Sequence, residues 1–314
     1  GGVVATGVML AVVGLVAKAV GTGWIDWLLP PVVTGTIVMV IGFNLAVAAK
    51  NGLASGPLLG TITLISIAFF AAFSRGFLGR ISIFLGVVVG YLVAFAMGDV
   101  KTDGISAAKW LAAPTFTSPT FKASAIVLFI PVVLVLIAEN VGHVKAVSAM
   151  TGKNLDDQVG NALFADGVAT TLAGAGGGSG TTTYAENIGV MAATRVYSTA
   201  AYWIAALGAL VLSICPKFGA LLSAIPGGVL GGAQTALFGM IGILGAKIWI
   251  ESKVNFSDST NLIVAATAII IGISDVSWTR GDFTFNGIIN ATLVAVVGYR
   301  VFSGIAKSRG TAAN

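Results

Sequence analysis

Charge is scarce in this chain. Asp, Glu, Lys and Arg make up 9% of its 314 residues, against roughly 25% in soluble domains. Cysteine and histidine occur once each, at Cys215 and His143. One cysteine excludes an internal disulfide framework and a cysteine metal site, and one histidine argues against a histidine-based zinc cluster. The chain has no HExxH pattern, serine nucleophile set or phosphate-binding glycine motif. We therefore expect no enzyme, no metal and no bound cofactor.

Apolar residues are abundant instead. They form 56% of the chain, and glycine accounts for 42 residues, about twice ordinary usage. Small residues let helices pack closely in lipid, where no hydrophobic force drives helices together. The composition predicts an all-α, multi-pass membrane protein that has the lipid bilayer as a partner. Ten apolar stretches are the expected spans, at about 3–20, 31–49, 58–73, 80–97, 123–143, 159–173, 199–214, 228–249, 261–274 and 285–303.

The net charge of +5 indicates cytoplasmic loops rather than nucleic-acid binding, because Lys and Arg gather on the cytoplasmic side of membrane proteins. The loops divide the 17 basic residues eleven to six. The richer side holds Lys18, Arg75, Arg80, Lys145, Lys153, Arg195, Lys247, Lys253, Arg300, Lys307 and Arg309, and the other side holds Lys50, Lys101, Lys109, Lys122, Lys217 and Arg280. The richer side includes the C-terminus, which we therefore expect to be cytoplasmic. The longest polar connection, 98–122, contains Trp110 and is expected to be an extracytoplasmic loop with an interfacial aromatic anchor.

One apolar segment is broken by a glycine run. Gly174 opens this run, three threonines follow at 181–183, and the pattern predicts a short strand and a half-helix over 179–194. Broken backbone and ionisable groups are tolerated in lipid only where they face protein or a cavity. Glu186 opens the half-helix, and Glu139 and His143 are four residues apart, on one helix face. With Asp166 in the next span, these residues are the candidate functional groups.

Each candidate also has a structural interpretation. Thr183 and Glu186 fit a capping box, in which a glutamate bonds back to the amide of the helix-starting residue. Glu139 and His143 could form a buried hydrogen-bonded pair that holds helices together. Asp166 could tie its helix to a neighbouring amide or hydroxyl, and Asn187 could lock the half-helix to another helix. The residues alone leave these alternatives open.

A faint internal repeat is also present. Pro30 and Gly35 recur as Pro226 and Gly231, both displaced by 196 residues. An odd number of spans lies between the copies, which predicts two halves of inverted topology, as in many secondary transporters. On this arithmetic the second half begins near residue 123, and three spans of the first half would precede Gly1.

Residues 186–195, Glu-Asn-Ile-Gly-Val-Met-Ala-Ala-Thr-Arg, resemble the signature of the nucleobase–ascorbate transporter (nucleobase:cation symporter-2) family. The Ala138–His143 helix is similar to the eighth span of that family, and Glu251–Val254 and Gly21–Pro31 resemble bacterial uracil permeases. The resemblance covers essentially the whole chain.

The resemblance implies an inverted-repeat fold of seven plus seven segments, with the first three absent here. It implies a core domain over 1–20 and 123–214 and a gate domain over 31–97 and 228–303. Family members often dimerise through the gate, so a homodimer is expected. The implied location is the bacterial inner membrane.

The resemblance also implies the site. Glu139 and Glu186 would hydrogen-bond the nucleobase with help from the backbone at Tyr184 and Ala185, and Glu139, His143 and Glu186 would take part in proton coupling. The residues that would shape the site are Asn187, Gly189, Thr194 and Asp166. The expected function is proton-coupled symport of uracil by alternating access. The alternatives are a xanthine, urate or anion transporter of the same fold, and a truncated membrane protein that does not transport.

Overall fold

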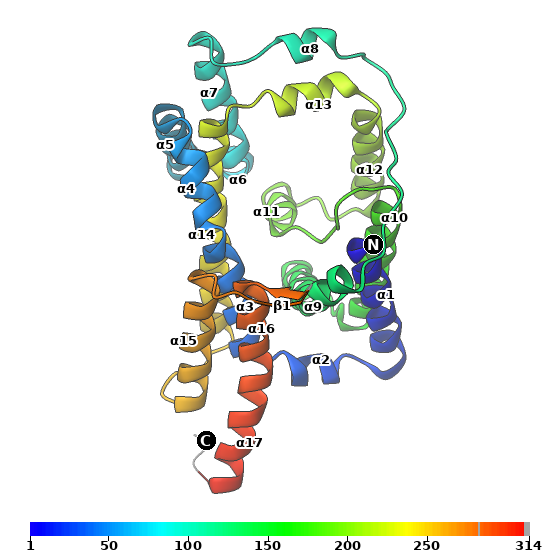
Figure 1. The fold of residues 1–314 in the computed structure, drawn as a ribbon, viewed down its shortest axis with the longest axis vertical. Coiled ribbons are helices and arrows are strands. Elements are labelled where there is room, and N and C mark those ends of the chain that lie inside the picture. Colours follow the sequence, from blue (N-terminus) through cyan, green and yellow to red (C-terminus); the bar gives the residue numbers. More distant parts are fainter. Residues whose placement is uncertain (282, 311–314) are drawn as a thin grey trace. The chain divides into compact units, whose positions relative to one another are not determined.

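A computed structural model describes residues 1–281 and 283–310, without the side chains of Pro131, Ala185, Glu186 and Ala193 and without the surroundings of Gly189. Most of the chain is helical (Figure 1). By their internal contacts the residues form two compact units.

The first unit contains Gly1–Leu45, Thr117–Tyr184 and the described residues from Gly239 onward. Its elements are α1 (Gly2–Val20), α2 (Gly23–Leu28), α3 (Pro31–Asn44), α9 (Ala123–Thr151), a 3-10 turn η1 (Asp156–Gln158), α10 (Val159–Ala175), the second part of α14 (Gly227–Glu251), α15 (Ser259–Ile273), β1 (Trp278–Arg280), β2 (Phe283–Phe285), α16 (Gly287–Leu293), a π-helical turn η2 (Val294–Gly298) and α17 (Tyr299–Arg309).

The second unit contains Ala46–Phe116 and Ala185–Phe238. Its elements are α4 (Ala46–Ala54), α5 (Pro57–Phe73), α6 (Phe77–Arg80), α7 (Ser82–Ala96), α8 (Asp103–Ala107), α11 (Ala185–Thr194), α12 (Thr199–Ser213), α13 (Pro216–Ser223) and the first part of α14. α12 and α13 meet at an angle of 84°, at the point where Pro216 opens α13 and fixes the backbone for a helix start.

All ten predicted stretches coincide with helices, which confirms an all-α, multi-pass membrane protein. In the described part of the chain, five helices are long and apolar enough to cross a membrane, or six if α12 and α13 form one bent span. The five are Gly2–Val20, Pro31–Ala54, Ala123–Thr151, Gly227–Glu251 and Gly287–Arg309. α5, α7 and α15 are shorter apolar helices.

α1 and α10 pack backbone against backbone, and they lie side by side in Figure 1. Glycines on both helices make this approach possible. A methyl group at Gly14 would collide with the backbone of α10 at Phe164 and lie 2.8 Å from the carbonyl oxygen of Gly160. A methyl group at Gly167 would lie 2.7 Å from the carbonyl oxygen of Gly7. The high glycine content therefore has a direct packing role, as expected for helices in lipid.

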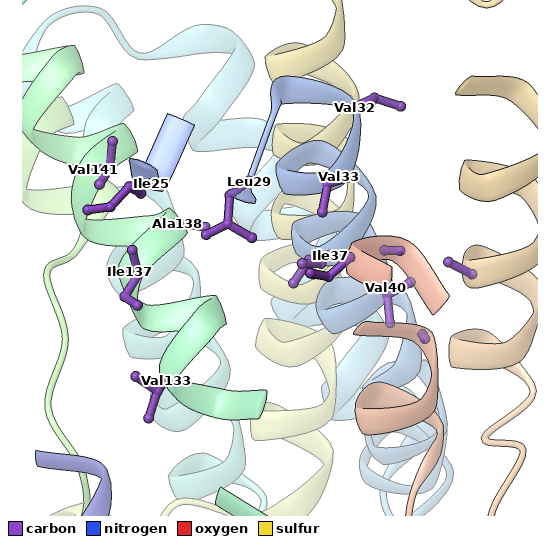
Figure 2. Packing of buried hydrophobic residues seen from close by; sticks show 14 of the residues in the cluster. Ile25, Leu29, Val32, Val33, Ile37, Val40, Val133, Ile137, Ala138 and Val141 are labelled. Atoms are coloured by element: carbon purple, nitrogen blue, oxygen red, sulfur yellow. The ribbon is translucent and has the colours of Figure 1, made fainter. Parts of the chain in front are cut away.

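The largest buried cluster joins α9 to α2 and α3 through aliphatic side chains. Figure 2 shows Ile25 and Leu29 lying between α3 and the face of α9 that carries Ile137 and Val141. Ile37 and Val40 continue this apolar surface along α3. The cluster places one face of α9 against aliphatic neighbours over several turns.

Two details differ from the sequence-based expectations. The predicted strand at 179–184 is extended chain with no ladder partner among the described residues, and its threonine hydroxyls bond to side chains of α9 and α10. A hairpin that was not predicted pairs β1 with β2 in antiparallel register. Its Trp278 and Phe285 rings stack with centroids 4.3 Å apart.

Candidate functional site

Glu139 and His143 lie one turn apart on α9 and reach the same extended segment. The hydroxyl of Thr182 donates to Oε2 of Glu139 over 3.1 Å. Nδ1 of His143 lies 2.6 Å from the hydroxyl of Thr183. Both α9 side chains are half-buried. The predicted common face of Glu139 and His143 is therefore confirmed, and consecutive threonines are their partners.

Thr181 points to α10 instead. Its hydroxyl donates to Oδ1 of Asp166 over 3.0 Å and lies 2.8 Å from the hydroxyl of Thr170, which also accepts from the Thr181 amide at 3.1 Å. Asp166 is only 8% exposed. The segment is therefore held on one side by α10 and on the other by α9.

Asp166 also bridges the two helices directly. Its Oδ2 accepts from Nδ2 of Asn140 over 2.9 Å, and Asn140 is fully buried. The Asn140 amide nitrogen donates as well to the Leu136 carbonyl at 2.9 Å. The interpretation of Asp166 as a residue that ties its helix to a neighbouring amide and hydroxyl is the one that this geometry supports.

The segment then enters α11 at Ala185. The side chains of Ala185 and Glu186, and the surroundings of Gly189, lie outside the described residues, so their assigned roles stay predictions. Tyr184 is 58% exposed and Asn187 is exposed. Thr194 donates to the Val190 carbonyl of its own helix at 2.9 Å.

Arg195 marks the end of α11. It follows the last helical residue, Thr194, and has a φ of 55°. Its amide donates to the Met191 carbonyl over 2.8 Å. This left-handed conformation is a common way to end a helix, although glycine is the usual residue there.

Two further contacts bear on how the loops are grouped. Lys145 and Asp26 form an ion pair of 2.9 Å in the first unit. In the second unit, the Lys217 amide donates to the Lys109 carbonyl over 3.1 Å, and Nζ of Lys217 lies 4.8 Å from the centre of the Trp110 ring. Each contact joins loops that the sequence assigned to the same side of the membrane.

Sequence reasoning missed the roles of the three threonine hydroxyls. The sequence pattern predicts a helix cap at Thr183 and a short strand at Thr181 and Thr182, and it does not predict the partners of their hydroxyls. A usable signal was present, because each hydroxyl in a water-poor region needs a partner. Three in succession beside a broken helix therefore indicate three polar partners nearby.

The side chains brought together here can donate and accept hydrogen bonds. A carboxylate accepts hydrogen bonds, a protonated carboxyl also donates one, and an imidazole can do either at each nitrogen. In the part of the chain that the structure describes, no group of three or more His, Cys, Asp or Glu residues could hold a metal ion. Such a set of groups can bind a small polar molecule and hold a proton.

Comparison with known proteins identifies the class. The model of the permease family matches residues 1–281. A putative pyrimidine permease of Escherichia coli, RutG, is 45% identical over 95% of this chain and 70% of the relative. The uracil permease of Escherichia coli is 40% identical over 94% of this chain and 72% of the relative. The uracil permease of Bacillus subtilis is 33% identical over 93% and 72%, respectively.

These matches, together with the apolar helices, define a multi-pass membrane transporter rather than an enzyme. The chain belongs to the permease family, and its resemblance to nucleobase–ascorbate transporters of the bacterial uracil permease type is confirmed.

Proposed function

We propose that this protein is a nucleobase permease that carries uracil together with a proton across the cell membrane. The substrate is inferred from relatives that are named uracil permease and pyrimidine permease. The proposal rests on one structural observation above all. Glu139 and His143 are held side by side by the threonines that lead directly into the α11 signature.

Glu139, Glu186 and the backbone at Tyr184 and Ala185 are the proposed nucleobase contacts. Uracil offers N–H donors and carbonyl acceptors on one small ring. Carboxylates match the donors, and the free amides at the start of a helix match the acceptors. The proposed arrangement therefore provides both kinds of partner along the edge of a flat polar ring.

Proton coupling is proposed to involve Glu139, His143 and Glu186. A carboxyl group in a water-poor environment changes its hydrogen-bonding character when it takes up a proton, from acceptor only to donor and acceptor. Substrate binding and protonation at Glu139 or Glu186 would then be linked, because the same oxygens serve both. No cofactor is required for this cycle.

Alternating access is proposed to come from movement of the core, 1–20 and 123–214, against the gate, 31–97 and 228–303. The contact of α9 with α3 is aliphatic, and apolar burial is non-directional. The two helices can therefore shift along one another without breaking aligned polar bonds, which supports this proposal. The homodimer through the gate and the cytoplasmic C-terminus stay predictions.

Radiolabelled uracil uptake by cells that express the complete gene product tests the proposal. We expect saturable uptake that is stimulated by an inward proton gradient. Glu139→Gln and Glu186→Gln should each reduce uptake at least about tenfold, because each removes a charged hydrogen-bond acceptor. Asp156→Asn, an exposed substitution in η1, is the control. Unimpaired, proton-stimulated uptake in both glutamine variants would contradict the site assignment.

A competition panel of uracil, xanthine and sulfate tests the substrate class separately. We expect unlabelled uracil to displace the label at the lowest concentration. Preferential displacement by xanthine or by sulfate would instead identify a purine or an anion transporter of the same family.

A further inference from the structure

The three consecutive threonines do not have equivalent partners. Thr181 bonds to Asp166 and Thr170, both on α10. Thr182 bonds to Glu139, and Thr183 to His143, both on α9. The first contact lies among buried residues, whereas Glu139 and His143 are half-buried groups that the proposed function uses.

We propose that Thr182 is a positioning residue that fixes the Glu139 carboxyl group for substrate binding. This inference rests on the proposed function of Glu139. Thr182 engages one of the two carboxylate oxygens, Oε2. This bond restricts rotation of the carboxyl group, and so it narrows the directions that Oε1 can take.

The chemistry of a hydroxyl suits this role. A threonine hydroxyl rotates freely and can both donate and accept. It donates to the ionised carboxylate, and it can accept from the protonated carboxyl without moving the backbone. Thr182 can therefore hold Glu139 in both of its protonation states, which a lysine or an asparagine amide nitrogen could not do.

Positioning of this kind should have a measurable effect on substrate binding. A glutamate side chain has several rotatable bonds, and ordering it only when substrate arrives weakens binding. A hydrogen bond to a charged group corresponds to about a 10- to 100-fold effect on an equilibrium. Loss of the Thr182 hydroxyl should therefore appear in the KM for uracil, with a smaller effect on the maximal rate per transporter.

Four variants separate positioning from folding. Thr182→Val has nearly the same shape but no hydroxyl, and Thr182→Ser keeps the hydroxyl. Thr181→Val removes the contact to Asp166. Thr171→Val is the matched control, because the Thr171 hydroxyl donates to Gly167 of its own helix at 2.8 Å. Each variant is introduced into the complete gene product, and surface expression, thermal unfolding temperature, KM and maximal uptake rate are measured.

We expect Thr182→Val to raise KM about tenfold, with an unfolding temperature close to that of the unaltered protein. Thr182→Ser should return KM to within about twofold of its original value. Thr181→Val should lower the unfolding temperature, and Thr171→Val should leave KM unchanged. An unchanged KM in Thr182→Val, or a failure of serine to restore it, would overturn the proposal.

Infrared spectroscopy provides a second test that does not depend on transport. The Glu139 carboxyl or carboxylate band is assigned by its loss in Glu139→Gln. That band should shift in Thr182→Val and stay in place in Thr171→Val. If it does not shift, Thr182 does not hold the carboxyl. If the unaltered protein takes up no uracil but the band shifts, the proposed function fails while the positioning contact stands.

Discussion

Asn140 donates to Asp166 over 2.9 Å, and this bond joins α9 to α10 between two side chains that are almost completely buried. It fixes the distance between the helix that carries Glu139 and the helix that anchors Thr181. The arrangement of the candidate site thus depends on a pair of residues that is not itself proposed to touch the substrate.

Asp166→Ala should destabilise the protein by about 2–3 kcal/mol. The substitution leaves the buried amide of Asn140 and the hydroxyl of Thr181 without their acceptor, and unsatisfied buried donors are costly. Asp166→Asn should cost less, about 1 kcal/mol, because its amide oxygen still accepts one of these bonds. Thermal unfolding in detergent measures both. Equal unfolding temperatures for the two variants would contradict this account.

Gly14→Ala should be strongly destabilising, by more than about 2 kcal/mol, because the new methyl group would collide with the backbone of α10. Gly208→Ala on α12 is the matched control, since nothing lies within 4 Å of the position of its methyl group. That substitution should be neutral or stabilise α12 by up to about 1 kcal/mol, because alanine favours helices. Equal loss of folded protein in both variants would argue against close α1–α10 packing.

Arg195→Gly should stabilise the end of α11 by about 0.5–1 kcal/mol, because glycine adopts a φ of 55° without strain. Arg195→Ala should not, since alanine keeps the strain and loses the charge near the helix C-terminus. Proteolysis or hydrogen exchange of α11 distinguishes the variants. Greater protection in the alanine variant than in the glycine variant would contradict a purely conformational role for this position.

Cys215 offers a direct test of orientation, because it is the sole cysteine of the chain. It lies just before α13, next to the Lys217 loop that the sequence assigns to the extracytoplasmic side, and it is partly exposed. A membrane-impermeant maleimide should label it in right-side-out vesicles and not in inside-out ones. Cys215→Ser provides the background. The opposite labelling pattern would reverse the predicted topology.

The length of each apolar stretch predicted the helices well. For α1 and α10 this length was a sufficient signal by itself. Residue spacing also predicted that Glu139 and His143 share a face, because four residues make about one turn. The partners of these residues were not predictable in the same way. Thr182 and Glu139 are 43 residues apart, and no pattern along the chain encodes which hydroxyl meets which carboxyl group.

The hairpin shows a second limit of prediction from the sequence. Trp278–Arg280 and Phe283–Phe285 are too short to give an alternating pattern, and the stacking of Trp278 on Phe285 depends on the pairing of the two strands. The predicted strand near residue 181 failed for the opposite reason. The composition favoured extended chain there, but a strand also needs a neighbour, which a local sequence does not specify.

The aliphatic contact of α9 with α2 and α3 (Figure 2) has a consequence for the proposed alternating access. Hydrogen bonds and ion pairs lose most of their strength when their atoms separate by about an ångström or rotate out of line. Burial of aliphatic side chains such as Ile37 and Ile137 is non-directional, and its contribution scales with the apolar area removed from water. In the proposed movement of core against gate, a sliding step that conserves this area would therefore meet a lower barrier than a step that breaks aligned polar bonds.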